Sequence, residues 1–170
     1  LESVRKQEYD KRLIEIIVAD GGSKDTTLKI AKKYNAKIVN VPSTKQSAEY
    51  NKGVGVNKAK NEILLLLDHD NALPHELWLK KMIQPFIDDK KIVGVEPLRF
   101  FYDRKMSFLD RYFSLIGGPD PVAYYFGKNS HLSWSFDEYN LAGKAEDKGD
   151  YYLVKFNRNN IPALGGNGAA

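Results

Sequence analysis

The sequence contains no cysteine and only three histidines, His69, His75 and His131. The missing cysteines exclude disulfide scaffolds, thiolate zinc sites and thiol nucleophiles. So few histidines make a metal site built from several of them a poor prospect, and we expect His75 and His131 on the surface. No apolar run approaches the roughly 20 residues that a membrane span needs. No P-loop motif is present, and no G-x-G-x-x-G follows a predicted strand, so neither pattern points to the ligand.

Neither basic nor acidic residues are in large excess. The 170 residues carry 26 Lys and Arg against 22 Asp and Glu, a formal net charge of +4. This mildly basic balance is compatible with a phosphate-bearing ligand or an anionic membrane surface. It is too small to indicate nucleic acid as a partner. The length fits one domain, and because the chain begins at Leu1 and ends at Ala169-Ala170, we expect that domain to be incomplete at both ends.

The first half of the chain alternates strand and helix patterns. The strands are predicted by short apolar or β-branched runs, at residues 13–19, 36–41, 62–67 and 90–98. Helical spacing separates them, with one helix expected over residues 47–58 and another from Pro74. This order predicts the α/β class, with a mainly parallel, twisted sheet sandwiched by helices. Further along we expect a helix at 106–116, a polar loop at 128–150 and a strand at 151–156.

Two carboxylates directly follow the strongest predicted strand, in the sequence Asp68-His69-Asp70. Ligands of parallel α/β sheets bind beyond the carboxyl ends of the strands. Side chains two residues apart can converge on one ion, and Mg²⁺ accepts carboxylate oxygens while keeping positions free for phosphate oxygens. The spacing is thus compatible with a metal site. The alternative is a helix cap at Asp70 or Asn71.

A second polar sequence, Asp20-Gly21-Gly22-Ser23, follows the predicted strand at 13–19. The glycines allow a tight turn or a close approach of the backbone to a ligand. Asp20 is placed to hydrogen-bond a base or a ribose. Taken alone, the sequence is better explained as a plain turn between strand and helix.

In combination these motifs resemble the glycosyltransferases of family 2. Residues 13–27 (LIEIIVADGGSKDTT) look like the opening nucleotide-binding block of that family. Asn51-Lys52-Gly53 and residues 59–70 (AKNEILLLLDHD) resemble the block that follows, with Asp-His-Asp at the place of the family's Asp-x-Asp metal motif. The glycine-rich end, Leu164-Gly-Gly-Asn-Gly-Ala, resembles the acceptor-side segment.

The resemblance implies a GT-A fold whose nucleotide-binding half is Rossmann-like. Residues 1–98 would bind the nucleotide sugar and residues 99–170 would face the acceptor, within a single glycosyltransferase domain. The implied reaction moves a sugar from a nucleoside-diphosphate sugar to an acceptor hydroxyl or a lipid phosphate, with inversion and with Mn²⁺ or Mg²⁺. The implied site residues are Asp20, Gly22, Asn51 and Asp68 for the donor, Asp70 with Asp68 for the metal, and Gly166 and Asn167 for the acceptor.

The family pattern also has consequences outside these motifs. Gly21 stands where many relatives carry a second aspartate, and Tyr50 where an arginine often precedes the asparagine. The general base of the family follows the glycine-rich segment, so we expect it beyond Ala170. A uridine diphosphate sugar is the favoured donor, and a sugar or polyprenyl phosphate the acceptor. The expected location is the cytoplasm, with peripheral contact to the inner face of a membrane left open.

Two other classes of protein remain compatible with the residues. A nucleotidyltransferase that makes sugar nucleotides would share the layered fold and a metal carboxylate, but it needs a glycine-rich, basic loop on its first strand. A non-catalytic binding module descended from an enzyme is the second alternative. The pair Asp68 and Asp70 argues against the module, because a protein without catalysis has no need of two costly carboxylates.

Overall fold

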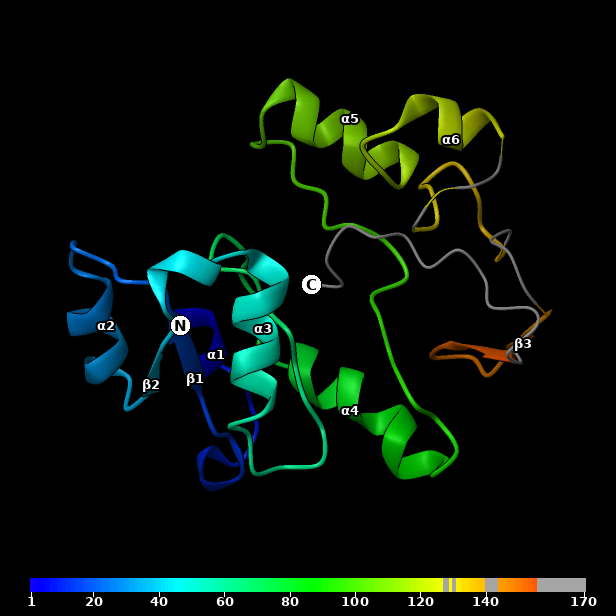
Figure 1. The fold of residues 1–170 in the computed structure, drawn as a ribbon. Coiled ribbons are helices and arrows are strands. Elements are labelled where there is room, and N and C mark those ends of the chain that lie inside the picture. Colours follow the sequence, from blue (N-terminus) through cyan, green and yellow to red (C-terminus); the bar gives the residue numbers. More distant parts are fainter. Residues whose placement is uncertain (127–128, 130, 140–143, 156–170) are drawn as a thin grey trace. The chain divides into compact units, whose positions relative to one another are not determined.

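A computed structural model of the chain describes residues 1–126, 129, 131–139 and 144–155. The chain divides into two compact units, residues 1–84 (unit 1) and residues 85–170 (unit 2). The division falls within helix α4 (Trp78–Asp88), so the chain passes from one unit to the other inside a helix (Figure 1). Within the described residues, no helix is both long enough and apolar enough to cross a membrane.

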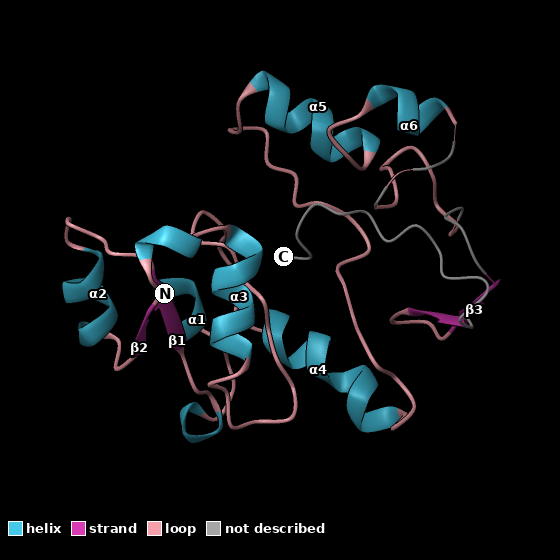
Figure 2. Cartoon of the chain, in the orientation of Figure 1, coloured by secondary structure: helices cyan, strands magenta, loops and turns pink. Residues whose placement is uncertain are grey.

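Unit 1 is built around a small parallel sheet. Strand β1 (Ile17–Asp20) pairs in parallel with β2 (Lys37–Asn40), and Asp20 lies opposite Asn40 at the carboxyl end. Helix α2 (Thr27–Lys33) forms the connection between the strands, as the alternating pattern predicts. Figure 2 shows these elements with α3 (Ala48–Val56) next along the chain. The predictions for residues 13–19, 36–41 and 47–58 are thus confirmed in type, with shorter elements.

The core of unit 1 joins its amino-terminal helix to the start of α4. Helix α1 (Glu2–Arg5) contributes Val4, which packs with Leu73, Trp78 and Leu79. Gln7 is 2% exposed, and its side chain is fully engaged. Its amide nitrogen donates to the carbonyl of His75 at 2.9 Å, and its amide oxygen accepts from the Leu79 backbone N–H at 2.8 Å. This side chain caps α4 from outside the helix, which begins at Trp78, four residues after the predicted start.

The predicted strands at residues 62–67 and 90–98 are not formed. Among the described residues, the sheets contain only the β1–β2 pair and one hairpin in unit 2. The apolar side chains Ile63, Leu64, Leu65 and Leu66 are 41–45% exposed. An apolar run becomes a strand only where a neighbour takes up its backbone N–H and C=O groups. Of the predicted twisted sheet between helices, the described residues show a two-stranded parallel part.

In its described residues, unit 2 combines the end of α4 with two further short helices and a hairpin. Its elements after α4 are α5 (Phe108–Ile116), α6 (Pro121–Tyr125), β3 (Lys144–Asp147) and β4 (Tyr152–Lys155). β3 and β4 pair antiparallel, with Asp147 opposite Tyr152. The predicted helix at 106–116 and strand at 151–156 are confirmed, whereas β3 lies where a polar loop was expected. Every residue of β3 is exposed, which explains why its composition resembles a loop.

The end of α5 fixes the packing within unit 2. Gly117 adopts φ +80°, and its N–H and that of Gly118 both donate to the Phe113 carbonyl. The His131 backbone N–H donates to the Gly117 carbonyl at 3.2 Å, and its ring lies 4.1 Å from the Phe100 ring. His131 is only 3% exposed, so the expectation of a surface histidine is wrong. The His131 imidazole packs against the Phe100 ring as an aromatic side chain would. The residues that surround His131 in the sequence do not indicate this burial.

Candidate functional site

The turn after β1 is organised by Asp20. This residue is 5% exposed, and its carboxylate accepts from the N–H of Gly22 at 2.9 Å and of Ser23 at 3.1 Å. The hydrogen bond from Ser23, helped by the Gly22 and Ser23 amides, lowers the pKa of Asp20 against the opposing effect of burial. Gly22 has φ +103°, a conformation that an L side chain rarely adopts. Asp20 is therefore charged and shapes the turn in which the sequence places a donor ligand.

The turn is also held from the segment before α3. The amide nitrogen of Gln46 donates to the Gly21 carbonyl, and a β-carbon added to Gly21 would collide with the Gln46 side chain. An aspartate at position 21, as many family members carry, would require Gln46 to move. The glycine at this position is thus matched to Gln46, a partner that the sequence pattern did not indicate.

Helix α3, which packs on β1, carries a buried polar atom in its Asn51 side chain. Ser47 caps the helix by accepting from the Tyr50 N–H at 3.1 Å. The helix packs on β1, where a β-carbon on Gly55 would lie 3.9 Å from the β-carbon of Ala19. On the same helix, the side-chain oxygen of Asn51 is buried and accepts no hydrogen bond from the described residues. Because such an oxygen is costly to leave without a donor, it is suited to an N–H or O–H group of a ligand.

Asp68 forms an ion pair with the same helix. Its Oδ1 lies 2.8 Å from Nζ of Lys52, and the two side chains are 32% and 30% exposed. Glu49, one turn before Lys52, belongs to the same group of charges. Its pKa is lowered mainly by its own backbone N–H and by Ser47, while Lys52 lowers it further and Asp68 opposes the change. The sequence motifs did not point to this ion pair, although the position of Lys52 beside Asn51 on the predicted helix was a usable signal.

The second predicted metal ligand is placed differently. Asp70 is exposed and makes no hydrogen bond or ion pair with the described residues, and His69 between the two aspartates is exposed as well. Among these residues, no group of three or more histidine or acidic side chains is arranged to hold a metal ion. Two carboxylates nevertheless fit Mg²⁺ or Mn²⁺, which is often bound by one or two carboxylates with water and substrate phosphates completing the shell. The metal site itself therefore stays a prediction.

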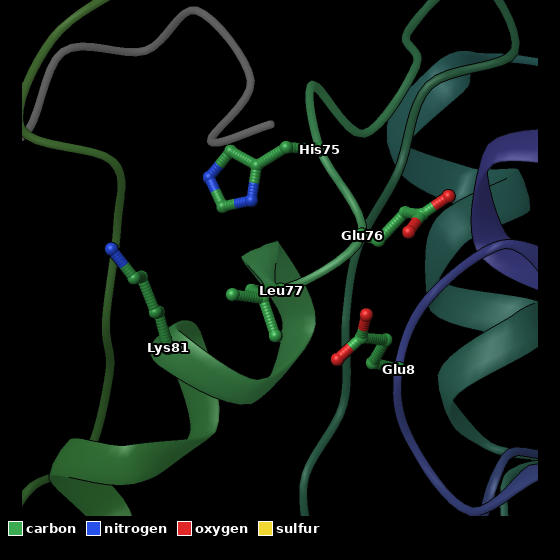
Figure 3. A pocket seen from close by; sticks show the side chains of 5 residues that line it. All are labelled: Glu8, His75, Glu76, Leu77 and Lys81. Carbon is green, nitrogen blue, oxygen red and sulfur yellow. The ribbon is translucent and has the colours of Figure 1, made fainter.

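The acceptor side of the predicted site is not available for comparison. Gly166 and Asn167 lie outside the described residues, and the general base expected beyond Ala170 also stays a prediction. A cavity of about 580 Å³ does occur in unit 1, lined by residues that none of the motifs includes: Glu8, His75, Glu76, Leu77 and Lys81. Figure 3 shows His75 and Lys81 pointing away from the two carboxylates. All five residues are exposed, and the cavity is an open hollow beside the start of α4.

Comparison with known proteins places the chain in a family. Residues 1–139 match the model of "Glycosyl transferase family 2", and the chain belongs to this family. It is 31% identical over 85 residues to "Glycosyltransferase AglE" of Haloferax volcanii, which covers 48% of this chain and 28% of that protein. It is 30% identical over 90 residues to "Chondroitin synthase" of Pasteurella multocida, covering 51% of this chain and 9% of the relative.

A third relative extends the match. The chain is 27% identical over 112 residues to "Chondroitin synthase" of Escherichia coli, covering 62% of this chain and 16% of that protein. In each of the three cases, the matched part spans less than a third of the curated relative. No solved structure matches the chain. The resemblance predicted from the motifs is thus confirmed at the level of the family.

Proposed function

We propose that this chain is part of a metal-dependent, inverting glycosyltransferase that moves a sugar from a nucleoside-diphosphate sugar to an acceptor hydroxyl or a lipid phosphate. The observation that carries the proposal is the family match over residues 1–139, which includes Asp20, Asn51, Asp68 and Asp70. The chain is α/β, with a parallel strand pair whose carboxyl end carries Asp20. We extend this to a GT-A fold, in which further strands would complete the sheet.

The proposed donor site uses the groups described above. Asp68 and Asp70 would hold Mn²⁺ or Mg²⁺, which when bound neutralises charge on the departing diphosphate. Asp20 and the turn at Gly22 would lie against the nucleoside. The buried oxygen of Asn51 would accept a hydrogen bond from the donor, since it has no such partner among the described residues. Gly166 and Asn167 are proposed to face the acceptor.

The donor and acceptor are proposed by class. A uridine diphosphate sugar is the favoured donor, and a sugar or a polyprenyl phosphate the favoured acceptor. Two of the relatives are named for chondroitin synthesis, which supports a polysaccharide or cell-envelope role. We also propose a cytoplasmic location, with peripheral contact to the inner face of a membrane where the acceptor is a lipid phosphate.

Calorimetric titration of the chain with nucleotides tests the proposal. Uridine diphosphate should bind in the presence of Mn²⁺ and bind at least tenfold more weakly when the metal is chelated. Asp70→Asn should remove this metal dependence, whereas the exposed Asp150→Asn should keep it. Thermal unfolding of both variants provides the control for folding.

The same titration distinguishes the two other classes of protein. A clear preference for a nucleoside triphosphate over the diphosphate would indicate a nucleotidyltransferase. Nucleotide binding that is indifferent to metal would indicate a non-catalytic module. Either result would contradict the proposed function.

A further inference from the structure

The ion pair between Lys52 and Asp68 is the most sheltered one that joins two elements of unit 1. Among the described residues, it is the only pair in which both side chains are 32% exposed or less. The pair connects α3 to the segment after residues 63–67, across 16 positions of sequence. Water screens this ion pair less than it screens a fully exposed pair. The attraction therefore favours a position of the Lys52 ammonium beside the Asp68 carboxylate.

This arrangement conflicts with the proposed role of Asp68. A divalent cation on the Asp68 carboxylate would stand close to the Lys52 ammonium, which lies 2.8 Å from one of its oxygens. Two like charges at such a distance repel strongly in a partly sheltered site. We therefore expect metal binding to move the ammonium away from Asp68, while α3 keeps the Lys52 backbone in place beside Asn51.

The displaced ammonium has two possible partners. One is Glu49 on the same helix, whose pKa already responds to Lys52. The other is the diphosphate of the donor, which in the proposed function arrives with the metal at the same carboxylates. A lysine reaches a phosphate readily, because its ammonium is a compact charge on a flexible four-carbon chain. The diphosphate carries more negative charge than Glu49 and is the stronger attractor.

We propose that Lys52 is the counter-ion of Asp68 in the free protein and moves to the diphosphate of a nucleoside diphosphate when metal and donor bind. This inference rests on the proposed function and adds a donor-binding residue to it. Lys52 then competes with the metal when no donor is present and assists binding once the donor is there. Removing its charge should change these two affinities in opposite directions.

Calorimetry of Lys52→Ala with Mn²⁺ alone, and then with uridine diphosphate in saturating Mn²⁺, tests both directions. We expect Mn²⁺ alone to bind about fivefold more tightly, because a competing ion pair is lost. We expect the nucleotide to bind roughly tenfold or more weakly, because a charged hydrogen bond is lost. Lys52→Arg should restore nucleotide binding in large part.

Lys29→Ala, an exposed position on α2, is the matched control and should leave both affinities unchanged. Circular dichroism of each variant verifies that the fold is kept. Unchanged nucleotide affinity in Lys52→Ala would overturn the inference and indicate that the ammonium turns to Glu49 instead. A wild-type protein that shows no metal-dependent nucleotide binding would overturn the proposed function together with the inference.

Discussion

The two units bury polar side chains in different ways. In unit 1, Gln7 and Asp20 are almost fully buried, and backbone groups meet their polar atoms at a helix start and at a turn. In unit 2, His131 is buried against the Phe100 ring, and burial lowers its pKa. The Nε atoms of Arg99 and Arg111 are buried there without a hydrogen-bond partner among the described residues.

This contrast has a functional meaning. In unit 1, the buried Asp20 shapes the turn of the proposed donor site, so function and stability meet in this residue. In unit 2, His131 is held by ring packing beside the left-handed Gly117, and no donor-site motif includes it. Substituting Asp20 in unit 1 should therefore change ligand binding as well as stability, whereas substituting His131 or Gly117 in unit 2 should change stability alone.

The largest effect is expected at Asp70. Because this side chain is exposed and makes no hydrogen bond or ion pair with the described residues, Asp70→Asn should leave the midpoint of thermal unfolding unchanged. In the full-length enzyme, sugar transfer should fall roughly a hundredfold or more, since the amide cannot supply the charge that the cation needs. A radiolabelled sugar transfer assay measures this. Retention of most metal-dependent activity would refute the assignment of Asp70 as a metal ligand. It would also contradict the functional role that the contrast gives to unit 1.

Gly117 gives the strongest expected effect on stability in unit 2. Its left-handed conformation costs an L side chain roughly 1–2 kcal/mol, and a β-carbon there would also strike the His131 carbonyl. Gly117→Ala should lower the free energy of unfolding by more than that backbone cost, measured by urea denaturation. Gly94→Ala is the control in the same unit, because nothing lies within 4 Å of an added β-carbon. Equal stability of the two variants would show that the left-handed conformation of Gly117 is not needed for the stability of unit 2.

Asp20→Ala tests whether function and stability coincide in unit 1. Loss of its hydrogen bonds to Gly22 and Ser23 should cost roughly 1–3 kcal/mol of stability. Uridine diphosphate should also bind about tenfold more weakly in calorimetry. The sequence predicted only the second effect, because the burial of this carboxylate was not visible there. A variant as stable as the wild type, with weakened nucleotide binding, would separate the two roles.

The smallest effect concerns acidification of unit 2. Burial lowers the pKa of His131, so the unfolded chain binds its proton more readily than the folded chain. Stability from the neutral ring is complete above the unfolded pKa of about 6.5 and is lost as the pH falls below that value. Burial raises the pKa of Glu96, so this group changes stability with pH in the direction opposite to His131. The test therefore compares the pH dependence of two proteins rather than that of the wild type alone.

The comparison is between the wild type and His131→Gln. Hydrogen exchange of residues 98–126 and 131–134 should show that acidification from pH 7.5 to pH 5 weakens the wild type more than the variant. Peptides from residues 1–84 should show no difference between the two proteins. The same pH dependence in both proteins would mean that protonation of His131 does not contribute to the loss of stability in acid.

The sequence predicted those features that depend on neighbours along the chain. The β-branched run before Asp20 and the helical spacing of α5 were sufficient for β1 and α5. Residues 62–67 were mispredicted because strand formation depends on a pairing partner, which an apolar run does not specify. The Lys52–Asp68 pair and the contact of Phe100 with His131 were missed for the same reason, since they join residues 16 and 31 positions apart.

The side chain of Gln7 also sets an order of events during synthesis. Its partners lie far along the chain, at His75 and Leu79. While a ribosome is still adding the residues before Leu79, the Gln7 amide has only the nearby Ser3 carbonyl available to it. Helix α1 therefore cannot take its native place until α4 has begun to emerge, well after β1, α2 and β2 are able to pair. Within unit 1, the parallel strand pair is therefore expected to form before α1 docks.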